Sequence, residues 1–104
     1  MNFSKELPLT ETTFFILLAL RSAAHGYAVM QQVEELSGGR VRIAAGTMYG
    51  ALENLSKQLL IQAVPSEDPR RKNYQITQRG SELLAAEAQR MQSLAELYKQ
   101  QTEE

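Results

Sequence analysis

The fold is decided by the stretch RVRIAAGTMYGALENL at residues 40–55. One set of apolar residues, continued just beyond the stretch, recurs at intervals of four, three and four: Met48, Leu52, Leu55 and Leu59. This spacing is typical of a buried stripe on an α-helix. The other side of the helix is thin and polar and carries Thr47, Tyr49, Gly50, Asn54 and Lys57. Such a helix can enter the major groove of DNA, so we interpret it as a candidate recognition helix; an ordinary amphipathic helix with a solvated face is the alternative.

Two further helices are expected before this stretch. The first begins near Thr10, whose hydroxyl can accept a hydrogen bond from the first turn, and is expected to run to about Ser22. Residues 14–20 are all apolar, which indicates burial on more than one face and, in so small a chain, contact with a partner subunit. The second helix starts after His25 and ends at the glycine pair of residues 38–39. A short strand over residues 40–43 is expected to lead into the candidate recognition helix.

After residue 59 the pattern changes to that of a β-hairpin followed by one long helix. Residues 60–64 and 73–76 are rich in strand formers, and the loop between them ends in a basic cluster, Arg70, Arg71 and Lys72. The terminal helix, which Thr77 can cap, would have roughly 24 residues and extend about 36 Å. Its apolar residues form a heptad-like seam: Leu84, Ala88, Met91, Ala95 and Tyr98. So small a domain cannot cover this seam, so a second chain is expected on it; a helix folded back on its own domain is the alternative.

Length and composition exclude several classes of function. A chain of 104 residues is expected to form one domain with one core and no deep enzymatic pocket. The absence of cysteine excludes disulfides, thiolate catalysis and cysteine-based zinc sites, and it fits a cytoplasmic protein. No leader peptide or membrane span is expected. The net charge is −1, but residues 36–74 carry six basic and three acidic side chains, so positive charge is concentrated around the candidate recognition helix and the hairpin.

Two helices, a candidate recognition helix and a basic hairpin form the winged helix-turn-helix arrangement, and the residues resemble the PadR-type transcriptional regulators. Four segments in the same order carry the resemblance: LTE at 9–11 with FFIL at 14–17, HGY at 25–27 with MQ at 30–31, GTMYGAL at 46–52, and DPRRKNY at 68–74 followed by Ile76, Thr77 and Gly80. The resemblance covers roughly residues 7–84. Two positions depart from it, because Leu59 stands where the family usually has glycine and Asn73 where an aromatic residue is common.

These patterns predict a mainly α fold of the α+β winged helix-turn-helix class, with three N-terminal helices, a two-stranded β wing and a long C-terminal helix. Residues 1–77 are expected to form the DNA-binding domain and residues 78–104 the dimerisation helix and tail. The residues expected to contact DNA are Arg40, Arg42, Thr47, Tyr49, Asn54, Lys57, Arg70, Arg71 and Lys72. Ion pairs with Glu34 or Glu35 are the alternative for Arg40 and Arg42. The residues expected at the dimer interface are Phe14, Phe15, Leu84, Ala88, Met91, Leu94, Ala95 and Tyr98.

The leading interpretation is a homodimeric repressor that binds double-stranded DNA, with two recognition helices in successive major grooves of a palindromic operator, roughly 34 Å apart. The resemblance implies the short form of the family, in which the terminal helix builds the dimer and a small, often aromatic effector binds at its centre. Phe14, Phe15, Met91, Leu94 and Tyr98 are candidate lining residues for that effector, and simple packing of the dimer seam is the alternative for each.

A winged-helix module that binds proteins and has no specific DNA target is the second interpretation. Steep weakening of binding with salt would distinguish phosphate binding from such an apolar protein interface. An enzyme is the least favoured interpretation, because no nucleophile pairs with a base and no carboxylate pair or metal cluster is recognisable. No catalytic residue, metal or cofactor is therefore expected. His25, the only histidine, is interpreted as a structural residue at a helix junction.

Overall fold

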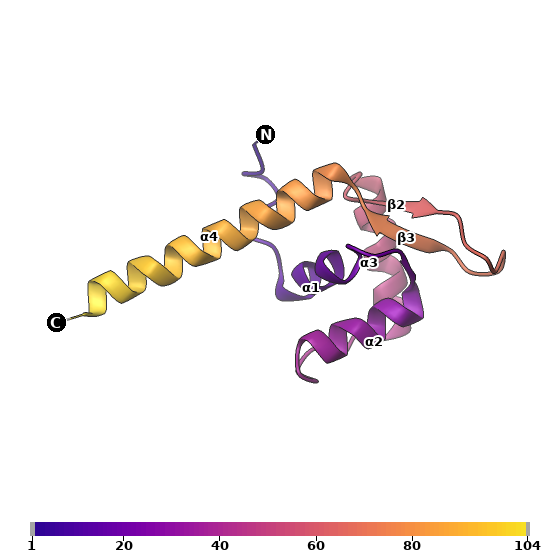
Figure 1. Ribbon diagram of the computed structural model, residues 1–104, viewed down its shortest axis with the longest axis horizontal. Coiled ribbons are helices and arrows are strands. Elements are labelled where there is room, and N and C mark those ends of the chain that lie inside the picture. The colour runs from indigo at the N-terminus through magenta and orange to yellow at the C-terminus, as the bar shows by residue number, and fades with distance from the viewer. Residues whose placement is uncertain (1, 104) are drawn as a thin grey trace.

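The computed structural model describes residues 2–103 and shows seven elements along the chain. They are α1 (Glu11–Ala19), β1 (Ala24–His25), α2 (Gly26–Leu36), α3 (Ala45–Lys57), β2 (Ile61–Val64), β3 (Asn73–Ile76) and α4 (Gln78–Thr102). Three helices and the sheet form one body, from which α4 projects on one side and the loop between β2 and β3 on the other (Figure 1). The molecule is therefore elongated, with extents of 59 × 32 × 20 Å. The mostly helical, winged-helix architecture predicted from the sequence is confirmed.

Side-chain caps begin three of the four helices. The Thr13 N–H donates to Thr10 Oγ1 at 3.1 Å at the start of α1, and the Gly80 N–H donates to Thr77 Oγ1 at 3.0 Å at the start of α4. The N-cap of α2 is His25, whose Nδ1 accepts the Ala28 N–H at 3.3 Å. Each cap satisfies a backbone donor that has no partner inside its helix. Two caps were predicted from the sequence, and the third shows that His25 has the structural role expected of it.

Three antiparallel strands form the sheet in the order β1-β3-β2. Ala24 pairs with Tyr74 and His25 with Asn73, so β1 adds a third strand to the predicted hairpin. The expected strand over residues 40–43 was wrong, because that segment is an irregular connection in which the Val41 N–H donates to Ser37 Oγ at 2.9 Å. The expected two-stranded wing is thus the β2–β3 part of a three-stranded sheet. We call residues 61–76 the wing.

Helix α1 ends at Ala19 and not near Ser22 as expected. The reason is that the carbonyl of the next residue, Leu20, accepts the Ile76 N–H at 2.8 Å, which ties the chain to the end of β3. Within α1, Ile16 and Leu17 are fully buried. The burial of α1 that its composition predicts is thus provided in part by the core of the same chain, without a partner subunit.

The core lies between α1, α2, α3, the sheet and the first turns of α4. Its fully buried side chains are Ile16, Leu17, Leu20, Val29, Val33, Met48, Leu52, Leu60, Ile61 and Leu83. Leu84 is only 8% exposed and also packs in this core. This residue was expected at the dimer interface, but its side chain lies within its own domain. The division of the chain at residue 77 stays a prediction, since the start of α4 is part of the core.

Leu59 makes the turn from α3 into β2 in the left-handed backbone conformation, with a φ of 63°. The Leu60 N–H donates to the Leu55 carbonyl at 3.0 Å, which closes the end of α3 as a helix C-terminus with a left-handed residue does. Thr77 Oγ1 donates to the Leu59 carbonyl at 2.6 Å, so the start of α4 is held against this turn. Leu59 therefore makes the same left-handed turn that glycine usually makes at this position in the family.

Candidate nucleic-acid interface

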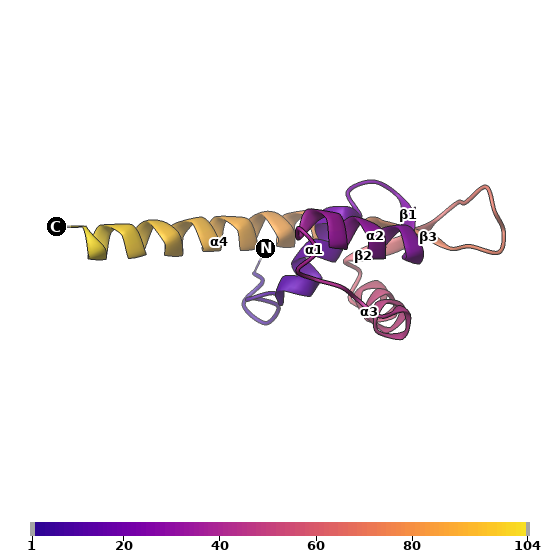
Figure 2. The same ribbon diagram turned by 90° about the horizontal axis from the view of Figure 1, so that it is seen from below.

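Helix α3 has one buried face and one bare face. Met48, Leu52 and Leu55 are at most 4% exposed, whereas Thr47, Asn54 and Lys57 are exposed and Tyr49 is 55% exposed. A Cβ built at Gly46 or Gly50 would meet no atom within 4 Å, so the outer face is thin as well as open. Figure 2 shows α3 at the edge of the molecule, with one side that no other element covers. This is the shape that a helix needs to enter a groove of DNA.

The first turn of α3 offers backbone donors to a ligand. Its N-cap residue, Ala44, has no side-chain acceptor for them. Residues 44–47 are exposed. Uncapped amides at the positive end of a helix bind phosphate oxygens readily.

One acidic residue, which is not among the predicted DNA contacts, lies on the outer face of α3. The side chain of Glu53 is 71% exposed, and its Oε1 lies 3.4 Å from Nζ of Lys57, one helical turn further on. The signal was present in the sequence, because residues 53 and 57 are four apart and both fall on the polar side of the helix. Glu53 lowers the positive charge of this face and gives it an acceptor.

The wing carries its cations on an exposed loop. The side chains of Arg70 and Arg71 are 89% and 59% exposed, and Lys72 is exposed as well. Asp68 holds both guanidinium groups, with its Oδ1 3.3 Å from Arg70 Nε and its Oδ2 3.9 Å from Arg71 Nε. The Arg70 backbone N–H, which donates to Asp68 Oδ1 at 2.9 Å, lowers the pKa of Asp68, and the two guanidinium groups lower it further. Asp68 therefore stays ionised and orients the cations.

The wing meets the helices at a cavity of about 450 Å³, which we call the junction cavity. Its lining includes His25, Tyr49, Arg70, Arg71 and Lys72. The Tyr49 ring packs directly on Gly26, because a Cβ at that glycine would lie 2.8 Å from Tyr49 Cε1. The structure thus brings four of the nine residues predicted to contact DNA around one cavity.

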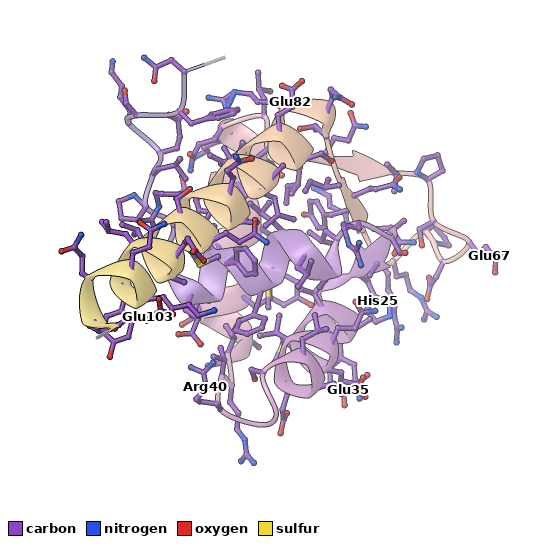
Figure 3. All side chains as sticks on the ribbon, turned by 60° about the vertical axis from the view of Figure 1, so that its left-hand side comes forward. His25, Glu35, Arg40, Glu67, Glu82 and Glu103 are labelled. Carbon is purple, nitrogen blue, oxygen red and sulfur yellow. The ribbon has the colours of Figure 1, made fainter. Side chains whose placement is uncertain are left out.

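The other predicted DNA contacts lie elsewhere. Asn54 lines a groove that α3 shares with residues 5–10. Arg42 Nε lies 3.2 Å from Glu34 Oε1, which is the ion pair considered as an alternative, and Arg40 pairs with Glu11 and not with Glu34 or Glu35. Figure 3 shows Arg40 well away from the wing loop that carries Glu67. Both arginine side chains stay more than 60% exposed despite these pairs.

The projecting half of α4 is exposed throughout. Every residue from Met91 to Thr102 is exposed, and the large apolar side chains among them are Met91, Leu94, Leu97 and Tyr98, with exposures of 41% to 71%. Ala88 and Ala95 are exposed too. Phe14 and Phe15 are half-buried and pack edge to face, with their ring centroids 6.2 Å apart. The exposed part of the predicted seam therefore begins after Leu84.

Residues 2–103 hold no group of three or more side chains that could bind a metal ion. Among these same residues, none of the helices could serve as a membrane-spanning segment. A bare helix face, an exposed basic wing and a helix-sheet body define the class of winged helix-turn-helix proteins.

Residues 16–86, more than half of the chain, match the model of the transcriptional regulator PadR-like family. The chain therefore belongs to the PadR-like family of transcriptional regulators, which implies that it binds DNA. This is a family of regulators and not of enzymes. The resemblance drawn from the four sequence segments is thus confirmed.

Solved structures of family members are similar over most of their length. A PadR family transcription regulator from Clostridium difficile R20291 superposes with a TM-score of 0.73 and 25% identity, covering 88% of this chain and 97% of the other. One from Eggerthella lenta gives a TM-score of 0.70 and 25% identity, covering 88% and 80%. A protein described as "Uncharacterized 37.1 kDa protein in transposon TN4556" from Streptomyces fradiae is 34% identical over 86 residues. The match covers 82% of this chain and about a quarter, 24%, of that relative.

Proposed function

We propose that this chain is a homodimeric, sequence-specific repressor that binds a palindromic operator and is released from it by a small aromatic effector. The observation that carries the proposal is the placement of the bare face of α3 beside the cations of the wing. Arg70, Arg71 and Lys72 border the same cavity as Tyr49 of α3, so helix and wing can contact one duplex together. In this arrangement the outer face of α3 reads base edges while the wing binds phosphates or the minor groove.

The dimer is supported by the exposed apolar side chains of α4. Leu94, Leu97 and Tyr98 are at least half exposed on a helix of 25 residues that projects from the body. A second copy of the same helix would cover this face with like side chains, as in an isologous twofold interface. Two copies would then present two α3 helices to one operator, which suits a palindrome.

The effector site would form between the two copies. Phe14 and Phe15 present half-buried aromatic rings on α1, and Met91, Leu94 and Tyr98 present exposed side chains on α4. Such side chains suit a flat, apolar molecule, which would change the spacing of the two α3 helices by wedging α4 away from α1. A ligand that binds one spacing better than the other shifts the population toward it.

The proposal is tested by the salt dependence of DNA binding. Replacing Arg70 with Ala should weaken binding to operator and random duplexes alike, and it should lower the slope of log K against log salt by about one. The variant Arg70→Ala with Arg71→Ala should lower the slope by about two. Arg21→Ala is the matched control, because Arg21 is an exposed arginine that does not line the junction cavity. An unchanged slope in the wing variants would refute the wing assignment, and binding that ignores salt altogether would favour a protein-binding module.

A further inference from the structure

Both ring nitrogens of His25 have a close neighbour, and the two contacts make conflicting demands on the ring protons. Nδ1 accepts the Ala28 N–H at 3.3 Å as the cap of α2. A neutral imidazole has one N–H, so with Nδ1 as an acceptor the proton is on Nε2. Nε2 lies 3.0 Å from Nη1 of Arg71, and a guanidinium nitrogen only donates. In this tautomer the two facing nitrogens are both donors, and neither accepts a hydrogen bond from the other. The opposite tautomer would let Nε2 accept from Arg71 but would leave the Ala28 N–H without its acceptor.

An acceptor with several lone pairs beside His25 Nε2 and Arg71 Nη1 would resolve this conflict, because it could accept a hydrogen bond from each of them. The surroundings favour an anion, because Arg70, Arg71 and Lys72 all border the junction cavity. Asp68, the carboxylate that pairs with Arg70 and Arg71, already accepts the backbone N–H and Nε of Arg70. A phosphate oxygen is anionic and accepts more than one hydrogen bond, and it forms stronger hydrogen bonds with charged donors than a neutral acceptor does.

We propose that His25 Nε2 and Arg71 Nη1 together bind one phosphate group of the DNA backbone in the junction cavity. This inference rests on the proposed function, in which α3 and the wing contact the same duplex. Tyr49 of α3 forms one wall of the cavity by packing on Gly26, so a phosphate held there lies between the recognition helix and the wing. His25 then has two roles: Nδ1 begins α2, and Nε2 fixes the position of the protein on DNA without reading sequence.

Figure 3 shows His25 on the side of the molecule from which the wing loop with Glu67 extends. The contact joins residues 46 positions apart in the chain, one at the start of α2 and one in the wing. Pairing of His25 with Asn73 in the sheet fixes the backbone beside the ring. The Nδ1 cap and the strand pairing thus fix the position of the ring before any DNA arrives, which lowers the entropic cost of the phosphate contact.

Two substitutions separate the roles of the two nitrogens. His25→Asn keeps an acceptor near the place of Nδ1, where Asn is a favourable cap, and removes the donor at Nε2. His25→Gln keeps a donor near the place of Nε2 and loses the short-range cap. We expect His25→Asn to fold with a thermal midpoint like that of the wild type but to bind operator and random DNA about tenfold more weakly. His25→Gln should show the opposite pattern, with a lower midpoint and DNA binding closer to that of the wild type.

The joint contact also predicts how His25 and Arg71 combine. Arg71→Ala should lower the salt slope by about one, whereas His25→Asn should leave the slope unchanged because it removes no charge. The double variant should bind only slightly more weakly than Arg71→Ala, since both side chains serve the same phosphate. Fully additive losses would overturn the joint contact.

A neutral phosphate substitute identifies the ligand directly. A series of duplexes, each with one methylphosphonate linkage, should contain one position per half-site that weakens the wild type strongly, weakens His25→Asn less because only the Arg71 contact remains, and hardly affects the double variant His25→Asn with Arg71→Ala. If no position behaves in this way, or if His25→Asn binds DNA like the wild type while Arg70→Ala still flattens the salt slope, this inference fails and the proposed function stands. If the wild type binds no DNA, the proposed function fails as well. Binding of inorganic phosphate that depends on His25, with DNA affinity unaffected by His25→Asn, would show a free-anion site instead and would also overturn the inference.

Discussion

Replacing Leu59 with Gly should stabilise the protein. Leu59 has a φ of 63°, and the left-handed conformation costs a residue with a Cβ about 1–2 kcal/mol. Glycine avoids this cost but adds flexibility to the unfolded chain, which offsets about 0.4–1 kcal/mol. The side chain is 68% exposed, so its removal sacrifices little burial. The net gain in the free energy of unfolding should therefore be about 0.5–1 kcal/mol for Leu59→Gly.

The control for this prediction is Leu59→Ala, which removes nearly the same side-chain contacts but keeps the Cβ. The difference between Gly and Ala at this position isolates the backbone strain and should be about 1 kcal/mol in favour of Gly. Urea unfolding followed by circular dichroism measures both variants, at matched chain concentrations because a dimer's stability depends on concentration. Equal stability of the two variants, or a less stable Leu59→Gly, would refute the claim that this turn is strained.

Three further predictions concern the α3 surface, the buried carboxylate of α4 and its exposed seam. Glu53→Gln should raise the affinity for random DNA, because a carboxylate repels phosphates. It should also reduce discrimination between operator and mismatched duplexes in competition binding, because a carboxylate accepts hydrogen bonds only from base amino groups. Equal discrimination would exclude Glu53 from base reading. Glu87→Ala should lower the free energy of unfolding by about 1–3 kcal/mol, since it leaves the Leu9 N–H, which donates to Glu87 Oε2 at 2.8 Å, without a partner. Arg90 and the Leu9 N–H hold the pKa of Glu87 below the ordinary 4.5, so the stabilisation by Glu87 is present above pH 4.5 and is lost as the pH falls through the lowered pKa. If Glu87→Ala leaves the acid sensitivity of unfolding unaltered, this prediction is wrong. Leu94→Glu should shift sedimentation toward the monomer with an unchanged far-ultraviolet spectrum, and a persistent dimer would show that α4 is not the main interface.

Much of the fold follows from periodicity and could be predicted. Helix α3 and helix α4 repeat apolar residues at helical intervals, and β2 and β3 flank a loop rich in turn residues. Strand β1 could not be predicted, because two residues have no period and Ala24–His25 becomes a strand only by pairing with β3. The end of α1 was likewise set by a distant partner, the N–H of Ile76.

The sequence predicted which charged and polar residues belong to the candidate site, but it did not predict how they are arranged in space. The basic cluster of the wing and the polar face of α3 stand out locally in the sequence. The fold decides that Arg71 lies beside His25 and that Leu84 turns inward, and no local pattern contains either fact. Glu53 was missed for another reason, because cations and hydrogen-bond donors are the side chains expected to contact DNA phosphates and a carboxylate is not. A contact between β1 and the wing, such as that of His25 with Arg71, can be predicted only once the order of the strands in the sheet is known.

The proposed function requires that the chain bind a specific DNA site as a dimer through α3 and the wing. The most direct test is titration of a labelled duplex from immediately upstream of the protein's own gene, with excess random DNA, over a series of salt concentrations. Retention should survive random competitor, weaken steeply with salt and saturate at two chains per duplex. Equal competition by random DNA, or binding that does not respond to salt, would contradict the proposed function.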